Sequence, residues 1–354
     1  MRIVVADEMN PNVLRELREI VSLTQGGYVH YLLDKSDESP AVRLERELVA
    51  AEVLIVRSET KLVKNTLAEL THPNLVLVAR AGIGLDNINV PLAQQMGLTI
   101  ANTPDAHIFN VSEHTIALIL ALSKDLRSAV NHADNGKWAK KQLKPVELYD
   151  KTLGIVGFGN IGQEVAKRLH YAFGMNVLFY DALPKESDFA TPVPLADLFA
   201  RSDVISLHLP SLESTKNIVN ETLLRLLKEG VILANTGRGD TVDENALWEI
   251  IRARPKMRVG LDVIATEETK DRPAVLPPTD IITMSRFLFT PHVASATDEA
   301  NERCGFAIAN FLREKSGLDT KWHGRKDLMA SVVGGSQKDL IQTRLRRVPA
   351  TMRV

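Results

Sequence analysis

The stretch TLGIVGFGNIGQEVAKRL, residues 152–169, joins an apolar run to a helical pattern through three glycines. Gly157, Gly159 and Gly162 have the spacing G-x-G-x-x-G. That spacing alone is weak evidence, but here an apolar strand precedes it and a helical pattern over residues 163–169 follows it. The first glycine permits a tight turn, the second lets the backbone approach a pyrophosphate, and the third lets helix and strand pack closely. The stretch therefore predicts a phosphate-binding turn.

The chemistry of this turn extends to the next strand. Asn160 and Ile161 lie at the predicted helix N-terminus, where backbone N–H groups and the helix dipole favour an anion. A second apolar run ends at Asp181, about 20 residues after the last glycine, where a carboxylate accepts hydrogen bonds from the adenosine ribose. A carboxylate there would repel a 2′-phosphate, so we expect NAD rather than NADP as the cofactor.

Short aliphatic runs alternate with amphipathic segments along most of the chain. Continuous short apolar runs are typical of strands buried on both faces of a parallel sheet. We predict such strands within residues 2–7, 51–58, 75–82, 98–104, 152–159, 176–181, 204–210, 230–237, 258–264 and 286–292. The repeat of strand and helix predicts an α/β fold with two doubly wound parallel-sheet domains.

Two longer helical patterns, residues 110–138 and 295–317, interrupt the repeat, and we expect them to form the crossings between the domains. One domain is then discontinuous and combines residues 1–104 with residues 293–320. Residues 105–292 would form a Rossmann-type NAD-binding domain inserted into it. The remaining tail, 321–354, has no clear core pattern, and the sequence does not indicate its role.

Composition limits the class of protein. Of 354 residues, 45% are hydrophobic and 25% are charged, which predicts packed globular domains. A formal net charge of −1 gives no indication of a nucleic-acid or membrane partner. The single cysteine, Cys304, fits a reducing cytosol, so we expect a cytoplasmic protein. Residues 1–12 do not read as a signal peptide, and no apolar run has the length of a membrane span.

Three predicted strand ends carry ionisable residues. Arg238 follows the strand within residues 230–237, Glu267 follows Asp262 by five positions, and His292 follows Pro291. Ligands of open α/β sheets gather at the carboxyl ends of the strands. A guanidinium grips a carboxylate in bidentate fashion, a histidine exchanges a proton near neutral pH, and a glutamate orients its ring. The combination predicts a hydride-transfer site.

Separate motifs then carry a family resemblance. They are VRSETKL (56–62), VARAGIGLDNINV (78–90), ANTPDAHIFNVSEHT (101–115), GFGNIG (157–162), NTGRGDTVDENAL (235–247), GLDVIATEE (260–268) and TPHVASAT (290–297). In order and spacing they resemble the D-isomer-specific 2-hydroxyacid dehydrogenase family, and most of all its short-form D-3-phosphoglycerate dehydrogenases. The resemblance implies an NAD-linked oxidoreductase and homodimer that acts on a small 2-hydroxy or 2-oxo acid. It makes Arg238, Glu267 and His292 catalytic, and the discontinuous domain the substrate domain.

The resemblance also implies contacts for cofactor and substrate. His208, Leu209, Thr236, Asp262 and Ser295 would lie near the nicotinamide, with Asp262 accepting from its carboxamide, although His208 also fits a structural role. Backbone N–H groups of Gly82, Ile83 and Gly84 would form a nest for the substrate carboxylate. Arg57 and Lys61, with Lys140 and Lys141, would bind a distal phosphate or phosphonate, as in 3-phosphoglycerate. A solvated lysine-rich loop is the alternative for the last two.

Some positions depart from the family pattern. Glu268 stands where proline is common, which leaves it as the alternative to Glu267. His107 replaces a usual asparagine, Ala106 a glycine and Ile264 an aromatic residue. These changes leave the exact substrate open. A non-catalytic dinucleotide sensor of the corepressor kind is the alternative function, which the Arg238–Glu267–His292 set disfavours because a sensor needs no general acid.

Overall fold

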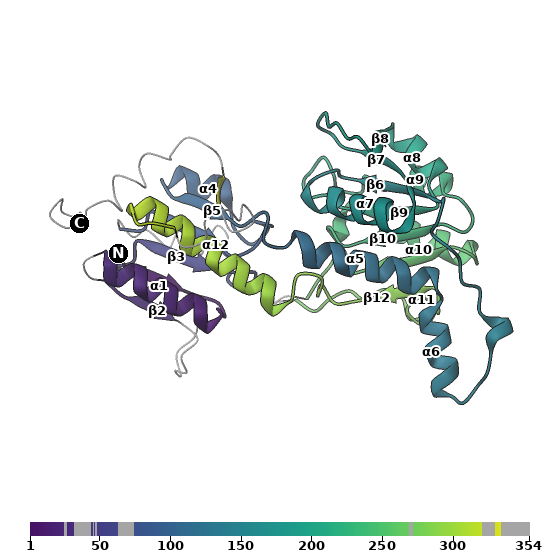
Figure 1. The fold of residues 1–354 in the computed structure, drawn as a ribbon, viewed down its shortest axis with the longest axis horizontal. Coiled ribbons are helices and arrows are strands. Elements are labelled where there is room, and N and C mark those ends of the chain that lie inside the picture. Colours follow the sequence, from purple (N-terminus) through teal and green to yellow (C-terminus); the bar gives the residue numbers. More distant parts are fainter. Residues whose placement is uncertain are drawn as a thin grey trace. The chain divides into compact units, whose positions relative to one another are not determined.

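The structure is a computed structural model that describes residues 1–24, 27–31, 44, 46, 48–62, 74–268, 272–320 and 330–333. The chain forms two compact units (Figure 1). Unit 1 combines Met1–His107 with the chain from Ala296 onward, and unit 2 is the single stretch Ile108–Ser295. Both boundaries fall a few residues after those expected from the sequence.

Unit 2 is built on a seven-stranded parallel sheet with the order β12-β11-β10-β9-β6-β7-β8. Its strands are β6 (Thr152–Val156), β7 (Asn176–Tyr180), β8 (Ala190–Pro192), β9 (Val204–Leu207), β10 (Ile232–Asn235), β11 (Arg258–Leu261) and β12 (Phe287–Phe289). Read from β8, the first six strands have the Rossmann order 3-2-1-4-5-6. The order reverses between β6 and β9, so the turn after β6 lies where such sheets bind ligands.

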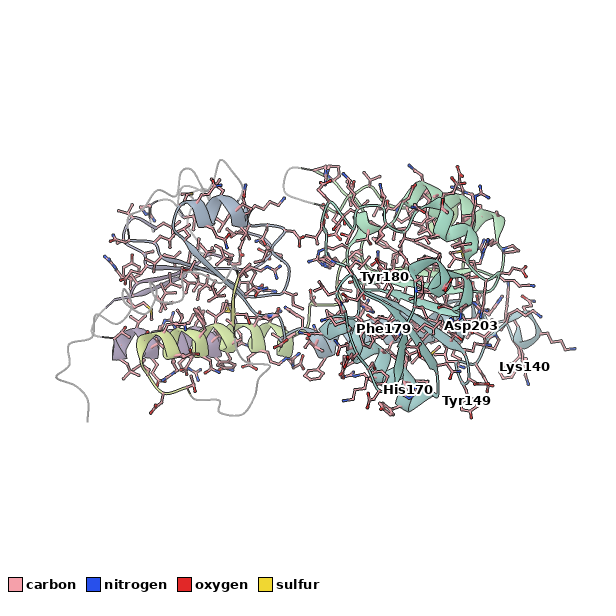
Figure 2. The ribbon with its side chains drawn as sticks, turned by 90° about the horizontal axis from the view of Figure 1, so that it is seen from above. Lys140, Tyr149, His170, Phe179, Tyr180 and Asp203 are labelled. Carbon is pink, nitrogen blue, oxygen red and sulfur yellow. The ribbon has the colours of Figure 1, made fainter. Side chains whose placement is uncertain are left out.

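The helices of unit 2 cover both faces of this sheet. They are α5 (Ile108–Ser123), α6 (Leu126–Asp134), α7 (Asn160–Phe173), α8 (Leu195–Arg201), α9 (Glu221–Leu226), α10 (Glu244–Ala253) and α11 (Thr279–Ile282), with short 3₁₀ turns at Lys140–Gln142 and Gly239–Thr241. Successive strand residues point to opposite faces. Ile155 therefore packs with α5 and α7, whereas Val156 packs with α8, α9 and α10. Figure 2 shows Phe179 of β7 within the body of the unit, where its ring stacks on Phe158.

Unit 1 has a six-stranded sheet with the order β13-β5-β4-β3-β1-β2. Its strands are β1 (Ile3–Val5), β2 (Val29–Tyr31), β3 (Val53–Val56), β4 (Leu77–Arg80), β5 (Thr99–Asn102) and β13 (Ser331–Val333). The first five are parallel in the flavodoxin-like order 2-1-3-4-5, whose switch point lies between β1 and β3. Helices α1 (Pro11–Leu23) and α12 (Asp298–Ser316) pack on one face, and α4 (Val90–Gln95) packs on the other. Two parallel-sheet α/β domains, the fold class predicted from the sequence, are thus confirmed.

The long helix predicted over residues 110–138 is wrong in its extent. It divides into α5 and α6 at Asp125, whose φ of 53° lies in the left-handed region that aspartate tolerates. The Asp125 side chain then accepts a hydrogen bond from the Ser128 hydroxyl at 2.5 Å. The predicted role of the two long helices as crossings also fails, because α5 lies wholly within unit 2 and α12 within unit 1.

Three strands were not predicted. β2 and β8 are three residues each and have little apolar character to mark them. β13 belongs to the tail that showed no core pattern, and it pairs antiparallel with β5, where the Gln94 side chain donates to the Val333 carbonyl at 3.0 Å. The rest of the tail lies outside the described residues. Within the described ranges, every helix is too short or too polar to serve as a membrane span.

Candidate active site

The glycine turn after β6 has the shape that a pyrophosphate needs. Gly157 has a φ of 91°, and a Cβ there would lie 2.6 Å from the His208 carbonyl oxygen. A Cβ on Gly162 would lie 2.2 Å from the Gly157 carbonyl oxygen, so α7 packs directly against the turn. A Cβ on Gly159, by contrast, would meet no described atom within 4 Å. The backbone at Gly159, which is the N-cap of α7, is therefore open for a phosphate group to approach.

Asp181 fixes this turn from the end of β7. Its Oδ2 accepts from the Phe158 N–H at 2.8 Å, and its Oδ1 accepts from the Leu183 N–H at 2.9 Å. Each carboxylate oxygen can accept about two hydrogen bonds, so both retain acceptor capacity for a ribose hydroxyl. Asn160 and Ile161 begin α7, where the sequence placed them.

The three predicted catalytic side chains follow three neighbouring strands. Arg238 comes three residues after β10, Glu267 comes after β11, and His292 comes after β12. Because these strands are parallel and adjacent, their carboxyl ends meet at one edge of the unit 2 sheet. The Arg238 guanidinium is half-buried, and its Nη1 donates to the Gly237 carbonyl at 2.8 Å.

His292 and Glu267 are in direct contact. His292 Nδ1 lies 2.8 Å from Glu267 Oε2, and the two side chains are 40% and 38% exposed. With Nδ1–H donating to the carboxylate, Nε2 is left to exchange a proton with a ligand. His292 has a φ of 52°, an uncommon backbone conformation for a non-glycine residue that often marks functional positions. Of the two glutamates the sequence left open, Glu267 is the one that contacts the histidine.

The turns that carry Arg238 and Glu267 are packed against each other. A Cβ on Gly239 would lie 2.0 Å from the Ile264 carbonyl carbon and 2.4 Å from the Ala265 nitrogen. The Ala265 N–H also donates to Glu244 Oε1 at 2.8 Å. Burial raises the pKa of the Glu244 carboxyl, and the hydrogen bond from Ala265 opposes this only in part. Glu244 was not singled out from the sequence.

Asp262 is completely buried, and its oxygens accept from three donors of unit 2 and lie close to His114. Oδ1 accepts from the Thr290 hydroxyl at 2.6 Å and the Val293 N–H at 3.0 Å, and it lies 3.3 Å from His114 Nε2. Oδ2 accepts from the Ala294 N–H at 2.9 Å. Burial favours a higher pKa for this carboxyl, but the donors outweigh it and hold the pKa below its usual value. A carboxamide contact, as predicted, would have to share these oxygens.

The other residues predicted near the nicotinamide are also at strand ends. Ser206 Oγ lies 2.8 Å from His208 Nε2, and burial lowers the pKa of His208 to about 4, so its ring is neutral. Leu209 approaches Gly237 closely, since a Cβ on the glycine would lie 3.1 Å from the Leu209 nitrogen. The Thr236 hydroxyl bonds to Thr115 of α5 at 2.7 Å, and Ser295 is the last residue of unit 2.

Comparison of the sequence with known proteins identifies the family of this chain. Residues 116–294 match the model described as D-isomer specific 2-hydroxyacid dehydrogenase, NAD binding domain. A hydroxypyruvate reductase of Thermotoga maritima is 41% identical over 273 residues, which are 75% of this chain and 85% of the relative. The chain belongs to the D-isomer specific 2-hydroxyacid dehydrogenase family. It is an NAD-dependent oxidoreductase, as the glycine turn and Asp181 predicted.

Two further relatives show what else the family contains. A D-3-phosphoglycerate dehydrogenase of Methanocaldococcus jannaschii is 34% identical over 321 residues, 89% of this chain but 57% of the relative. The chain thus spans little more than half the length of that enzyme. A crystal structure of D-lactate dehydrogenase from Aquifex aeolicus with NAD and lactic acid has a TM-score of 0.72 at 29% identity, covering 87% of this chain and 93% of that one.

Unit 1 of the dehydrogenase carries the predicted substrate-binding residues. Arg57 follows β3 at the switch point, and its guanidinium donates to the Glu8 carbonyl at 3.2 Å and to Asn301 Oδ1 at 2.9 Å. Lys61 is exposed. After β4, the Gly82 N–H donates to the Arg80 carbonyl at 2.9 Å, which closes a γ-turn. That N–H is therefore engaged, and the predicted nest is reduced to the N–H groups of Ile83 and Gly84.

Two residues that depart from the family pattern are buried in unit 1, and the two predicted lysines of unit 2 are exposed. His107 is buried, and its Nε2 lies 3.1 Å from Cys304 Sγ. Ala106 is fully buried, and its carbonyl accepts from Arg303 Nε at 3.1 Å. Lys140 and Lys141 lie exposed on a 3₁₀ turn of unit 2, and Figure 2 shows the Lys140 side chain extending away from the body of that unit.

Replacing Asp181 by alanine is expected to weaken NADH binding and to relax discrimination against NADPH. The substitution removes the ribose acceptor, the charge that repels a 2′-phosphate and the acceptor of the Phe158 N–H. Titration of both cofactors by protein fluorescence measures the change. A wild-type preference for NADPH would contradict the role given to this carboxylate.

The sequence did not single out His114 and Thr290, although both lie within motifs that carry the family resemblance. His114 Nε2 lies 3.0 Å from Thr290 Oγ1, and both side chains reach Asp262. The sequence shows only a histidine within an amphipathic helical pattern. Many helices contain such a histidine without any contact to an active site. Their connection depends on helix α5 lying against the end of β12, which no spacing in the sequence reveals.

Proposed function

We propose that this dehydrogenase interconverts a small D-2-hydroxy acid and its 2-oxo acid, with His292 as the general acid and base. The contact of His292 Nδ1 with Glu267 Oε2 carries the proposal. It leaves Nε2 to take the hydroxyl proton in oxidation and to return it in reduction, while Glu267 stabilises the charged ring. NAD, when bound, accepts or supplies the hydride. Residues of the turn Gly157–Gly162 and Asp181 would hold it.

Arg238 would bind the substrate carboxylate in this scheme. A guanidinium presents two parallel N–H donors that match a planar carboxylate, and this contact would direct the substrate C2 hydroxyl toward His292. The comparisons name enzymes of this kind and offer no support for a corepressor-like sensor.

Mixing the protein with NADH and a panel of 2-oxo acids, then following NADH absorbance, tests the function. We expect oxidation of NADH with at least one of pyruvate, hydroxypyruvate and 3-phosphohydroxypyruvate. Tight NADH binding without turnover on any member of a broader panel would instead favour a sensor.

A substrate with a distal phosphate or phosphonate, such as 3-phosphoglycerate, is the more specific proposal. Arg57 supports it, because the residue lies at the switch point of unit 1, and clustered cations suit a dianion. Arg57→Ala is then expected to raise KM for the phosphorylated acid by roughly tenfold or more, the loss of a charge-assisted contact worth about 1.5–3 kcal/mol. The effect on glycerate should be much smaller.

Steady-state kinetics of the wild type, Arg57→Ala and a control variant, each with 3-phosphoglycerate and with glycerate, measure this difference. Arg15→Ala is the control, since it removes an exposed cation of helix α1 that is not among the residues predicted to bind substrate. Equal effects of Arg57→Ala on KM for both acids would reject a distal anion site. So would higher wild-type activity on acids that lack the phosphate.

We also propose that the protein is a homodimer. The most apolar helix, α5, does not offer a free surface for a partner, because Leu118, Ile119 and Leu122 are buried within unit 2. Helix α6 supports the dimer instead. None of its residues is buried, and Leu126 and Val130, one helical turn apart, are 46% and 57% exposed. Trp138, four residues after the helix ends, is 95% exposed.

Sedimentation equilibrium at micromolar concentration should give twice the chain mass of 39.2 kDa. A double substitution, Leu126→Glu with Val130→Glu, should shift the mass toward the monomer, because it charges the apolar stripe of α6. A wild-type mass of one chain would reject the dimer. A cytosolic location remains an expectation from the single cysteine.

A further inference from the structure

The loop that carries His292 is attached to the end of β11 by one bond to Leu261, from the Thr290 N–H at 2.9 Å, and otherwise through Asp262. The His292 N–H donates to the Asp262 backbone carbonyl at 2.8 Å and to the Thr290 carbonyl at 3.0 Å. The next two N–H groups, of Val293 and Ala294, donate to the two oxygens of the Asp262 side chain. Asp262 thus holds residues 292–294 through its backbone carbonyl and its buried carboxylate, at the point where His292 has a left-handed backbone conformation.

Asp262 is in turn held from helix α5. The Thr290 hydroxyl donates its one hydrogen to Asp262 Oδ1, at 2.6 Å. His114 Nε2 is 3.0 Å from that same hydroxyl oxygen, which can then only accept from it. His114 therefore carries its proton on Nε2 and donates to Thr290, and it lies 3.3 Å from the carboxylate itself. The histidine side chain is 23% exposed, whereas the carboxylate is completely buried.

This contact has a neighbour that fixes α5 to the sheet. Thr115, the next residue, bonds through its hydroxyl to Thr236 after β10 at 2.7 Å. Helix α5 thereby contacts the ends of β10 and β12, the strands that precede Arg238 and His292. The position of His114 relative to Thr290 is therefore defined by two adjacent contacts rather than by one flexible side chain.

We propose that His114 is a positioning residue for His292, acting through Thr290 and Asp262. The proposal rests on the proposed function of His292. The Nε2–H of His114 holds the Thr290 hydroxyl in the orientation that donates to Asp262, and Asp262 holds the three N–H groups that shape the His292 loop. Without that donor, the loop samples other conformations and His292 leaves its contact with Glu267 for part of the time. Buried networks of this kind act as a unit, because a missing member leaves its partners unsatisfied.

His114→Leu removes the donor while keeping a side chain of similar size, and His114→Gln keeps an N–H donor at similar reach. Misplacement of a catalytic group by about 1 Å lowers rates by on the order of 10²-fold. We expect kcat to fall by roughly 10- to 100-fold in His114→Leu, with the affinity for NADH unchanged, and to recover to within about threefold of wild type in His114→Gln. His132→Leu, on α6, is the matched control and should leave kcat unchanged.

Amide hydrogen exchange of the peptide covering residues 290–295 provides a second measurement that needs no turnover. His114→Leu should speed exchange of the His292, Val293 and Ala294 amides, because their opening becomes more frequent, and His114→Gln should not. Thr290→Val breaks the same path at a different residue and covers the case in which His114→Leu does not fold. The double variant, His114→Leu with Thr290→Val, should have a kcat no lower than that of the slower single variant, because both substitutions interrupt the same path.

Wild-type kcat and wild-type exchange in His114→Leu or Thr290→Val would overturn the proposal. So would additive losses in the double variant, or a His114→Gln variant as slow as His114→Leu, since packing rather than the donor would then matter. Failure of the proposed function can be told apart from failure of this proposal. If the wild-type protein turned over no 2-oxo acid, the exchange measurement would still test whether His114 holds the loop of residues 290–294.

Discussion

Replacing His292 by alanine is expected to lower turnover by roughly 10²–10⁴-fold, the contribution typical of general acid–base catalysis. NADH affinity should change little, because the glycine turn and Asp181 lie after β6 and β7, whereas His292 lies after β12. Stopped-flow measurement of NADH oxidation and fluorescence titration of NADH binding separate the two effects.

Two other substitutions make this experiment specific. Glu267→Gln keeps a hydrogen-bond partner for His292 Nδ1 but removes the charge, so we expect a smaller loss than in His292→Ala. His132→Ala removes a histidine of α6 and should leave the rate unchanged. Near-normal turnover in His292→Ala would remove this residue from the role proposed for it.

The second large effect is expected from Gly239→Ala. The new Cβ would lie 2.0 Å from the Ile264 carbonyl carbon, a separation that backbone atoms cannot keep, so the turns carrying Arg238 and Glu267 must move apart. Overpacking of this kind typically lowers the free energy of unfolding by about 1–3 kcal/mol. Because both turns carry proposed catalytic side chains, we expect kcat/KM to fall by on the order of 10²-fold as well.

Gly230→Ala is the matched control for this steric effect. A Cβ on Gly230 meets no described atom within 4 Å, so that variant should unfold and react like the wild type. Chemical denaturation and steady-state kinetics of the two variants measure both quantities. A Gly239→Ala variant with wild-type kinetics would show that the two turns need not be in contact for catalysis.

Local patterns of the sequence predicted most of what positions the site. The apolar runs predicted ten of the thirteen strands in the described residues, since most of these strands are buried and apolar along their length. The glycine spacing and Asp181 predicted the glycine turn. Gly157 has a positive φ, a Cβ on Gly162 would meet a backbone atom, and the open space at Gly159 leaves room for a phosphate group. These are constraints between residues close together in the chain.

Contacts between distant segments could not be predicted in the same way. The helix breaks at Asp125, which has a left-handed backbone conformation. A glycine would have suggested such a break in the sequence, whereas an aspartate does not. The three donors to the Asp262 carboxylate come from residues 290–294, and His114 approaches it from α5. No spacing in the sequence shows that these groups converge on one carboxylate. β13 pairs with β5 across more than two hundred residues, and its three residues are too few for a recognisable period.

The pairing of β13 with β5, and of α1 with α12, has a consequence for the synthesis of the protein. Unit 1 is made from both ends of the chain, whereas unit 2 is one uninterrupted stretch, Ile108–Ser295. Ribosomes add roughly 5–20 residues per second, so the first strands wait about 10–40 s for the partners that complete their sheet and cover its face. During that interval the apolar residues of β1 and β5 are exposed on the nascent chain, while unit 2 can already fold. We therefore expect newly made chains to engage chaperones through their N-terminal third until the last segment leaves the ribosome.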